Sequence, residues 1–426
     1  MISEPALLSK LTRRLIPFMF LLYIVAYLDR INVGFAALQL NAALKFDPEV
    51  FGLGAGIFFI GYFIFEIPSN LIMQRVGARI WIARILVTWG VISSATMFVN
   101  GPMTFYILRF LLGLAEAGFF PGMILYLTYW FPAEARGRAV ARFMTATAIA
   151  GVIGGPVSGA LLKLDGVAGL AGWQWLFLIE GLPAVILGFV TLVYLPDSPK
   201  NAGWLTAEEK EWLASRLAVE RELVHRHGHV TLREALASGH VWTLSVIYFA
   251  VIISFYGISL WLPQIVQSFS GLSDFLVGFV SAIPYLAAAI GMVFIARNSD
   301  RWNERRWHIA LSAFTGAAGL MAAAFLKLPG AELGALAVAA IGIWGTLGPF
   351  WAMSSRILSG TGAAAGIALI NSVGNLGGFL GPYMIGLVRS RTNSFSGALL
   401  ALALFPLAGG IVTMASVIDR RYRRSS

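Results

Sequence analysis

The chain alternates between long apolar runs and short polar segments. Twelve of these runs have roughly 20 or more residues, the length that a helix needs to cross a hydrocarbon core of about 30 Å. The pattern therefore predicts an all-α membrane protein with twelve transmembrane helices. We expect these spans at residues 17–39, 52–74, 80–100, 103–130, 138–163, 174–195, 240–267, 275–297, 307–326, 332–354, 361–388 and 397–418.

The composition excludes a soluble fold. Of 426 residues, 58% are hydrophobic and 12% are charged, whereas soluble domains have roughly 25% charged residues. The chain has no cysteine, which excludes disulfides, thiol catalysis and cysteine metal sites. Lys10, Arg13 and Arg14 precede the first apolar run. Because this run is too long for a signal peptide and no small-residue cleavage site follows it, we expect a retained first span.

The basic residues are distributed unevenly between the two sides of the predicted bundle. Of the 31 lysines and arginines, 24 fall in segments on the side of the N-terminus and 5 on the other side. These five are Lys45, Lys163, Lys327, Arg389 and Arg391. Cytoplasmic loops of membrane proteins carry such an excess of basic residues. We therefore expect both termini in the cytoplasm, and we do not interpret the net charge of +10 as a sign of nucleic-acid binding.

The apolar pattern stops in the middle of the chain. Residues 196–239 hold 13 of the 52 charged residues. We expect an N-terminal six-helix bundle at 1–195, a cytoplasmic linker at 196–239 and a C-terminal six-helix bundle at 240–426. Within the linker, Thr206 and Glu209 form a capping box that predicts a short amphipathic helix at the membrane surface. The three histidines at 225, 227 and 229 lack a supporting carboxylate or cysteine pattern, so we interpret this segment as a solvated loop and predict no metal site.

Two landmarks indicate an internal repeat. Gln74-Arg75 lies 226 residues before Asp300-Arg301, and Gly155-Pro156 lies 226 residues before Gly381-Pro382. A duplicated six-helix unit explains both offsets. Transporters built from such repeats bind their substrates near the middle of the membrane, where the repeats meet.

Longer motifs carry a family resemblance. The segment NLIMQRVGAR at 70–79 resembles the loop signature of the major facilitator superfamily, and SDR at 299–301 resembles its second copy. The segments YLDRIN at 27–32, FEIPSN at 65–70 and RFLLGLAEAGFFPG at 109–122 resemble the anion:cation symporter family. The resemblance implies two pseudo-symmetric six-helix bundles in a bacterial inner membrane, and substrates such as tartrate, sugar acids, phthalate or hydroxyphenylacetate.

The loop signature implies a gating motif. Its members here are Gln74, Arg75, Gly77, Arg79, Asp300 and Arg301. The superfamily has an acidic residue at the position of Gln74. We therefore expect hydrogen bonding to replace the charge at this gate.

Charged residues inside the spans point to the chemistry. Each costs at least roughly 2.5 kcal/mol to insert, so each calls for a function or a partner. They are Asp29, Arg30, Glu66, Arg109, Glu116 and Glu180, all in the first half of the chain. For Glu66 and Glu180, which lie near prolines, we favour a structural role at helix bends.

Two of these carboxyls are predicted near the middle of the membrane. Counting from Pro17 and Trp130, the helical rise places Asp29 about 18 Å and Glu116 about 21 Å deep. Burial favours the protonated form of a carboxyl and a neighbouring arginine opposes it, a balance that suits a proton switch. We predict that Asp29 and Glu116 bind and release the coupling protons, and the resemblance implies the same roles.

The anion is expected to bind on one face of the first span. Tyr23, Tyr27 and Arg30 share this face, and a guanidinium binds carboxylates through paired hydrogen bonds. In the alternative, Asp29 and Arg30 only pair with other helices to fix their packing. Arg109 lies nearer the outside than Glu116, where it could receive incoming anions or brace the outer gate.

The second half is expected to supply neutral contacts. Asn371 and Asn375 lie one turn apart, and an amide can donate to a carboxylate or hydroxyl of the substrate. Tyr256 and Trp351 could line the cavity, although such aromatic residues more often anchor helices in the membrane.

These features predict a secondary active transporter that acts as a monomer by alternating access. We expect symport of a small organic anion with protons, without a cofactor. The alternative is an anion exchanger or a proton-coupled exporter, because the glycines 151, 155 and 159 around Pro156 resemble a motif of drug-proton exchangers; close helix packing also explains them. All five histidines fall in loops or at span ends, so we predict no enzyme.

Overall fold

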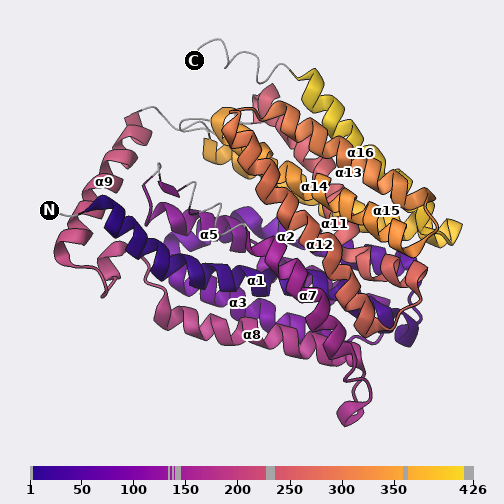
Figure 1. The fold of residues 1–426 in the computed structure, drawn as a ribbon. Coiled ribbons are helices and arrows are strands. Elements are labelled where there is room, and N and C mark those ends of the chain that lie inside the picture. Colours follow the sequence, from indigo (N-terminus) through magenta and orange to yellow (C-terminus); the bar gives the residue numbers. More distant parts are fainter. Residues whose placement is uncertain are drawn as a thin grey trace.

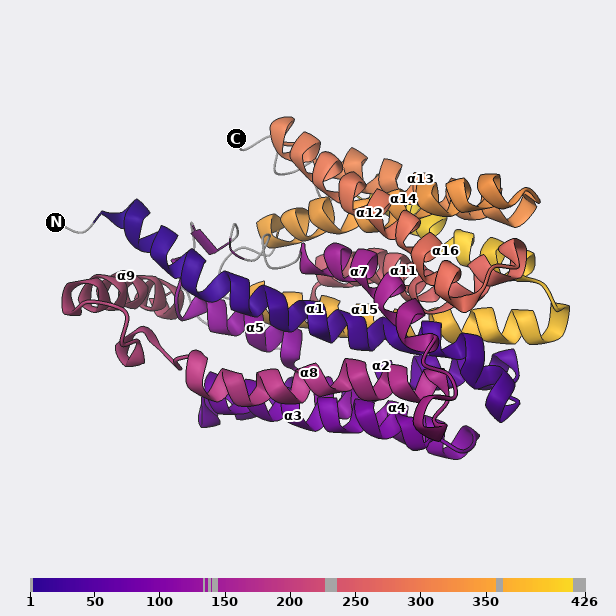
Figure 2. The same cartoon turned by 60° about the horizontal axis from the view of Figure 1, so that its bottom comes forward.

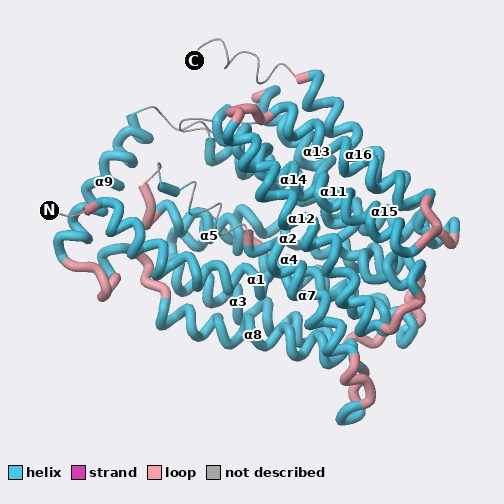
Figure 3. Tube along the Cα trace, viewed as in Figure 1, coloured by secondary structure: helices cyan, strands magenta, loops and turns pink. Residues whose placement is uncertain are grey.

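The structure is a computed structural model that describes residues 3–132, 135–136, 139, 145–226, 236–357 and 363–416. Within these ranges the chain is helical and contains no strand (Figure 3). Among the described residues, ten helices, with α4 and α5 counted together, are long and apolar enough to cross a membrane, and Ile149–Leu162 is a shorter apolar helix. The predicted all-α membrane fold is confirmed.

Helices of the first half of the chain are α1 (Glu4–Leu44), α2 (Pro48–Val76), α3 (Ala78–Ala95), α4 (Pro102–Glu116), α5 (Phe119–Thr128), α7 (Ala146–Leu162) and α8 (Gly172–Tyr194). Those of the second half are α11 (Gly239–Ser270), α12 (Asp274–Arg301), α13 (Arg306–Phe325), α14 (Pro329–Ile357), α15 (Ala363–Thr392) and α16 (Phe395–Ala415). The long axes of the two sets run roughly alongside each other, and the two sets meet along one junction (Figures 1 and 2). We call the bundle end at which α1 begins and α16 ends the terminal end, and the opposite end the distal end.

The structure differs from the predicted spans in two places. Helix α1 begins at Glu4, well before the apolar run, because Leu7, Leu11 and Leu15 continue a buried stripe toward the N-terminus. The span predicted at 103–130 is broken into α4 and α5. At the break Gly118 has φ +84°, and a side chain there would collide with Ser69 of α2. Glycine permits both the left-handed backbone and the close approach.

The 226-residue offset recurs in the helix bounds and the packing. Helices α1 and α11 end at Leu44 and Ser270, and α2 and α12 begin at Pro48 and Asp274. Helix α2 packs against α15, and the equivalent pair α12 and α7 packs in the same way. In both pairs, small residues let the backbones approach closely. The structure therefore supports the internal repeat.

The central segment is attached to the first half. The predicted capping box is present: the Thr206 N–H donates to Glu209 at 2.8 Å, and the Glu209 N–H donates to the Thr206 hydroxyl at 3.2 Å. It opens helix α9 (Ala207–Arg226), beside the N-terminus in Figure 1. The Lys10 ammonium lies 2.7 Å from a Glu209 oxygen, and Trp204 stacks on Trp130 at 5.7 Å.

Two predictions about this segment stay open. Its position at the membrane surface remains a prediction. The side chains of the histidines at 225, 227 and 229 lie outside the described part of the chain.

Candidate functional site at the junction of the two halves

Arg30 lies where α1 crosses α11. Its Nη1 donates a hydrogen bond of 2.8 Å to the Tyr256 hydroxyl, and these two residues are 226 positions apart. One turn further along, a Cβ at Gly34 would lie 2.6 Å from the carbonyl oxygen of Leu260, again its equivalent in the repeat. Equivalent residues of two repeats can meet only near the axis that relates the repeats. Arg30 therefore lies near the pseudo-twofold axis.

Glu116 is the second partner of Arg30. It is the last residue of α4, it is fully buried, and its Oε1 accepts a hydrogen bond from Arg30 Nη2. The dipole of α4 opposes a negative charge at this helix end. Arg30 is therefore the group that stabilises Glu116 as a carboxylate, and the structure brings together these two predicted site residues.

Aromatic rings surround the Arg30 guanidinium. Its carbon lies 5.5 Å from the ring centroids of Phe58 and Tyr62, and 6.0 Å from that of Tyr256. Rings at such distances attract a cation through their π faces. The cage holds the charge in the membrane interior with only one carboxylate bonded to it.

Tyr23 and Tyr27, the other residues of the predicted face, are buried beside this cage. Tyr23 stacks on Phe120 at 5.6 Å. Tyr27 packs edge-on against Phe255 of α11 at 6.3 Å. The two tyrosines therefore lie toward α5 and toward the second half, on the side where Arg30 lies.

Asp29 does not share this environment. It is 1% exposed and accepts hydrogen bonds from Trp89 and Ser93 of α3, and from Asn32 at 3.0 Å. These three donors hold Asp29 inside the first half, between α1 and α3. The predicted convergence of Asp29 with Arg30 and Glu116 is therefore incomplete, because adjacent residues of a helix point about 100° apart.

A second carboxyl belongs to the Asp29 network. Glu180 of α8 accepts a hydrogen bond of 2.7 Å from Ser158, and the Asn32 side chain, which donates to Asp29, lies near it. One amide thus lies between Asp29 and Glu180. The i, i+3 spacing of Asp29 and Asn32 on one helix is a signal in the sequence for their contact.

Arg109 is a buried cation without a polar partner among the described residues. It is 1% exposed, and none of its guanidinium nitrogens has a hydrogen-bond partner within the described part of the chain. Its guanidinium carbon lies 5.0 Å from the centroid of Phe58, the ring that Arg30 also contacts. An unpaired buried guanidinium is costly in a membrane. The two arginines beside Phe58 make this region favourable for an anion.

Glu66 links the two halves on the terminal side of Arg30. Its Oε1 accepts a hydrogen bond of 2.6 Å from Asn371, and its Oε2 accepts one of 3.1 Å from Ser372, both on α15. Asn375 lies in the same group. Both Glu66 oxygens are bonded to α15 and not to the backbone at the Pro68 bend, so the structural role predicted for Glu66 takes the form of a link between α2 and α15. Asn371, a predicted substrate contact, is bonded to Glu66 in this conformation.

The two predicted cavity residues of the second half, Tyr256 and Trp351, lie in different places. Tyr256 belongs to the Arg30 cage, as its hydrogen bond shows. Trp351 packs against Tyr248 at 5.0 Å and Phe350 at 5.4 Å, toward the terminal end of α14. Tyr256, but not Trp351, is therefore placed to contact an anion bound at Arg30.

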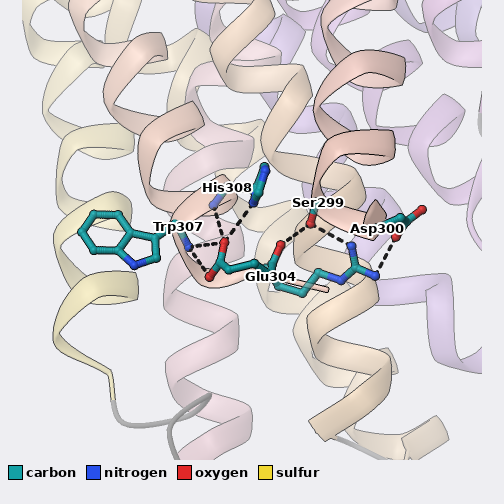
Figure 4. Close-up of polar contacts among 6 residues, drawn as sticks. Ser299, Asp300, Glu304, Trp307 and His308 are labelled. Atoms are coloured by element: carbon teal, nitrogen blue, oxygen red, sulfur yellow. Dashed lines mark hydrogen bonds and ion pairs between the residues drawn. The ribbon is translucent and has the colours of Figure 1, made fainter. Parts of the chain in front are cut away.

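The two loop signatures form different ion pairs. In the second copy, Arg305 lies 2.6 Å from Asp300 and donates to Ser299 at 2.8 Å (Figure 4). Its equivalent in the first copy, Arg79, pairs instead with Asp197, which follows α8, at 3.5 Å.

Asp197 also explains the glycine of the first signature. Its carboxylate accepts from the Arg79 backbone N–H at 2.9 Å, and it lies against Gly77, whose φ of +99° suits a glycine. The hydrogen bonding predicted for Gln74 at this gate stays a prediction. Gln74, Arg75 and Arg301 are exposed, and Asp197 supplies the missing carboxylate.

The three central charged residues are closed off from solvent in this conformation. Asp29, Arg30 and Glu116 are 1%, 7% and 0% exposed. A cavity of about 450 Å³ lies instead at the distal end, lined by residues of both halves. None of the three charged residues lines it.

Comparisons with known proteins agree with the motifs. A model of the Major Facilitator Superfamily matches residues 19–382. A protein of Agrobacterium vitis, provisionally named a tartrate transporter, is 50% identical over 411 residues, which cover 96% of this chain and 91% of the relative. A quinolone resistance transporter of Acinetobacter baumannii is 45% identical over 410 residues, which cover 96% and 94%.

A solved structure shows the same fold. It is a bacterial homologue of the human lysosomal transporter Spinster, in an inward-facing and occupied conformation. The TM-score is 0.77 at 16% identity, with 96% of this chain and 97% of that chain covered.

Proposed function

Because this chain belongs to the Major Facilitator Superfamily and is a membrane transporter rather than an enzyme, we propose that it carries a small organic anion together with protons. The observation that carries the proposal is the bond between Arg30 and Glu116 near the pseudo-twofold axis. A guanidinium in this position binds carboxylates. In the present conformation its carboxylate partner is the protein's own.

Competition for Arg30 couples the anion to the proton. A carboxylate substrate can replace Glu116 at the Arg30 guanidinium only when Glu116 releases its hydrogen bond to that group. Protonation of Glu116 removes its negative charge and weakens that bond, because hydrogen bonds between charged groups are the stronger ones. One proton therefore enters the site with one carboxylate, and the charge around Arg30 stays constant.

Arg109 and Tyr256 complete the proposed substrate site. Arg109 lies beside the same phenylalanine as Arg30 and has no partner among the described residues, so it can attract a second carboxylate or a hydroxyl of the substrate. Tyr256 offers its hydroxyl from the opposite half. Tartrate, which the name of one relative contains, has two carboxylates and two hydroxyls and suits this arrangement.

We propose roles for the remaining residues on the same basis. Asp29 is a second protonation site inside the first half, held apart from the substrate by its three donors. Asn371 and Asn375 contact the substrate after Glu66 releases them. The halves 1–195 and 240–426 move as two bodies joined by the linker 196–239, and protons are the only coupling partner, with no cofactor.

The topology and setting are part of the proposal. The excess of basic residues in terminal-end segments supports a cytoplasmic location of both chain ends. The bacterial relatives support the inner membrane of a bacterium. We propose that the monomer is the working unit, because the axis and the buried charges belong to a single chain.

Export of an aromatic carboxylate is the second candidate. The relative that confers quinolone resistance favours it, since quinolones carry a carboxylate on an aromatic ring. The glycine motif adds little support, because Gly155 and Gly159 serve the close packing of α7 on α12: a Cβ at Gly159 would lie 3.0 Å from a carbonyl oxygen of α12.

Transport in proteoliposomes tests the proposal. The purified chain is reconstituted, and uptake of labelled tartrate, phthalate and a quinolone is measured without a proton gradient, with one directed inward and with one directed outward. Accumulation of one of them that requires the gradient is the expected result. Failure to move any carboxylate under either condition would refute the function, and accumulation driven by an outward gradient would favour the exporter.

A further inference from the structure

The cavity at the distal end lies on the same axis as Arg30. Three pairs of its lining residues are equivalent in the repeat and 226 positions apart: Leu38 with Gln264, Asn41 with Gln267, and Ala42 with Ser268. A cavity lined by equivalent residues of both repeats surrounds the axis that relates them. Its volume of about 450 Å³ is ample for a small carboxylate.

The cavity is separated from Arg30 by contacts between α1 and α11. Asn41 lies eleven residues beyond Arg30, which corresponds to about 16 Å along the helix. Between them, Gly34 meets the backbone of Leu260. At the cavity itself, the Asn41 amide donates to the Gln264 oxygen at 3.2 Å across the junction. The distal cavity and the central site therefore both lie along the pseudo-twofold axis, and the contacts between α1 and α11 close the path between them.

Arg389 gives the cavity its charge. This residue of α15 lines the cavity, and its guanidinium carbon lies 3.7 Å from the centroid of the Phe395 ring. It has no ion-pair or hydrogen-bond partner in the described ranges, and its Nη1 is buried and unsatisfied. A guanidinium positioned in this way is available to a planar carboxylate.

Neutral groups of the cavity add a further donor. The Gln264 side-chain nitrogen is buried and has no partner among the described residues. Asp274 keeps its negative charge, and both of its oxygens already accept hydrogen bonds, one from Gln39 at 3.0 Å and the other from Gln267 at 2.9 Å. The donors left free in the cavity are thus a guanidinium and an amide, which together favour an anion.

We propose that this cavity is a waiting site for the carboxylate substrate at the distal entrance, with Arg389 as its anchoring cation. The inference rests on the proposed transport of organic anions and adds a second binding site to it. An anion held there stands about 16 Å from Arg30 and reaches it when α1 and α11 separate. Because few cations lie on the distal side, Arg389 also raises the local concentration of anions at the entrance.

The test compares two neighbouring arginines. Arg389→Gln removes the cavity cation, and Arg391→Gln removes an exposed cation two residues away that does not line the cavity. Tartrate uptake from the distal side is measured at low ionic strength in proteoliposomes of defined orientation. We expect the KM of Arg389→Gln to rise about tenfold, the effect of losing one charge-assisted bond. Arg391→Gln should change the KM less than twofold.

Transport in the opposite direction separates binding from structure. Loading from the terminal side does not use the cavity, so the KM of Arg389→Gln should there equal that of the wild type, and Arg389→Lys should restore most of the distal affinity. Equal changes on both sides, or in both arginine variants, would overturn the waiting site. Wild-type protein that moves no carboxylate would instead refute the proposed function.

A second variant covers the case in which Arg389→Gln does not fold. Ser268 lines the cavity and is exposed, so Ser268→Glu places a carboxylate there without disturbing the core. It should raise the distal KM for tartrate, whereas Ser268→Lys should lower it. An unchanged KM in both Ser268 variants would also refute the proposal.

Discussion

Substitution of Glu116 by glutamine gives the sharpest test of the coupling mechanism. In the wild type, the Glu116 carboxylate competes with the substrate for Arg30, so anion binding should strengthen as the pH falls and Glu116 becomes protonated. A competition that involves one proton changes the Kd by at most tenfold per pH unit. Hydrogen bonds to charged groups contribute about 1.5–3 kcal/mol, so the total loss of affinity at high pH should be about 10- to 150-fold.

Glu116→Gln removes the competitor and keeps the shape of the side chain. Its Kd for tartrate should therefore stay near the low-pH value of the wild type across the whole pH range. Asp29 can still be protonated, but the proton that enters with the carboxylate at Arg30 is lost, so the variant should still exchange labelled for unlabelled tartrate but should not accumulate it. The wild type can reach about a tenfold concentration ratio for each unit of pH gradient and each coupled proton, because one pH unit is worth about 1.36 kcal/mol.

The assay is the quenching of tryptophan fluorescence by tartrate in detergent at a series of pH values, followed by uptake and exchange in proteoliposomes. Glu332→Gln is a matched control, since Glu332 lies in the first turn of α14 at the distal end and away from Arg30. A pH slope in Glu116→Gln equal to that of the wild type, or preserved accumulation, would refute the competition for Arg30.

Three further outcomes are expected. Glu66→Ala and Asn371→Ala should each destabilise the protein, and a double-mutant cycle on unfolding in detergent should give a coupling of about 1–2 kcal/mol; additive effects would contradict the bond between the halves. Glu180→Gln should unfold like the wild type because an amide still accepts from its serine partner, whereas Glu180→Ala should lower stability by about 1–3 kcal/mol; equal thermal midpoints would contradict this. Hydrogen bonds from Lys10 and the Thr206 backbone hold the pKa of Glu209 below its usual range, so the contact of α9 with α1 should persist above this lowered pKa and be lost as the pH falls through it. Limited proteolysis of the linker should then accelerate, and Glu209→Gln should cleave fast at every pH.

The sequence predicts the fold well because membrane insertion leaves a strong pattern. Runs of apolar residues set the spans, and two short landmarks were enough to find the 226-residue repeat that the helix bounds reproduce. The break after Glu116 was missed, because the glycine that permits it lies in an apolar run. Only the approach of α2 to Gly118 shows why the helix must end there.

The sequence predicts which residues belong to the site better than it predicts which side chains they bond to. Charged residues inside apolar spans are costly to insert and therefore rare, so the sequence alone identifies the buried charges of the site. The rotation of Asp29 toward α3 and the bond of Glu66 to α15 depend on which helices are neighbours. The pattern of one chain does not contain that information, so the bond of Glu66 to α15 and the pairing of Arg79 with Asp197 could not be predicted from it. The 226-residue offset, however, already paired Arg30 with Tyr256, and this signal could have been used.

The duplication itself explains why the charges of the spans gather in one half. Residues near a pseudo-twofold axis face their own copies, so a duplicated unit with an arginine at this position would place two guanidinium groups in contact. At about 4 Å, two like charges repel by about 4 kcal/mol even at the effective dielectric of a protein surface, and burial in a membrane strengthens the repulsion. The two copies must therefore differ at the axis, and here the second copy has Tyr256, which accepts a hydrogen bond from Arg30. Once one half holds the cation, the carboxylate that competes for it is most effective in the same half, because Glu116 then stays beside Arg30 while the two halves move relative to each other.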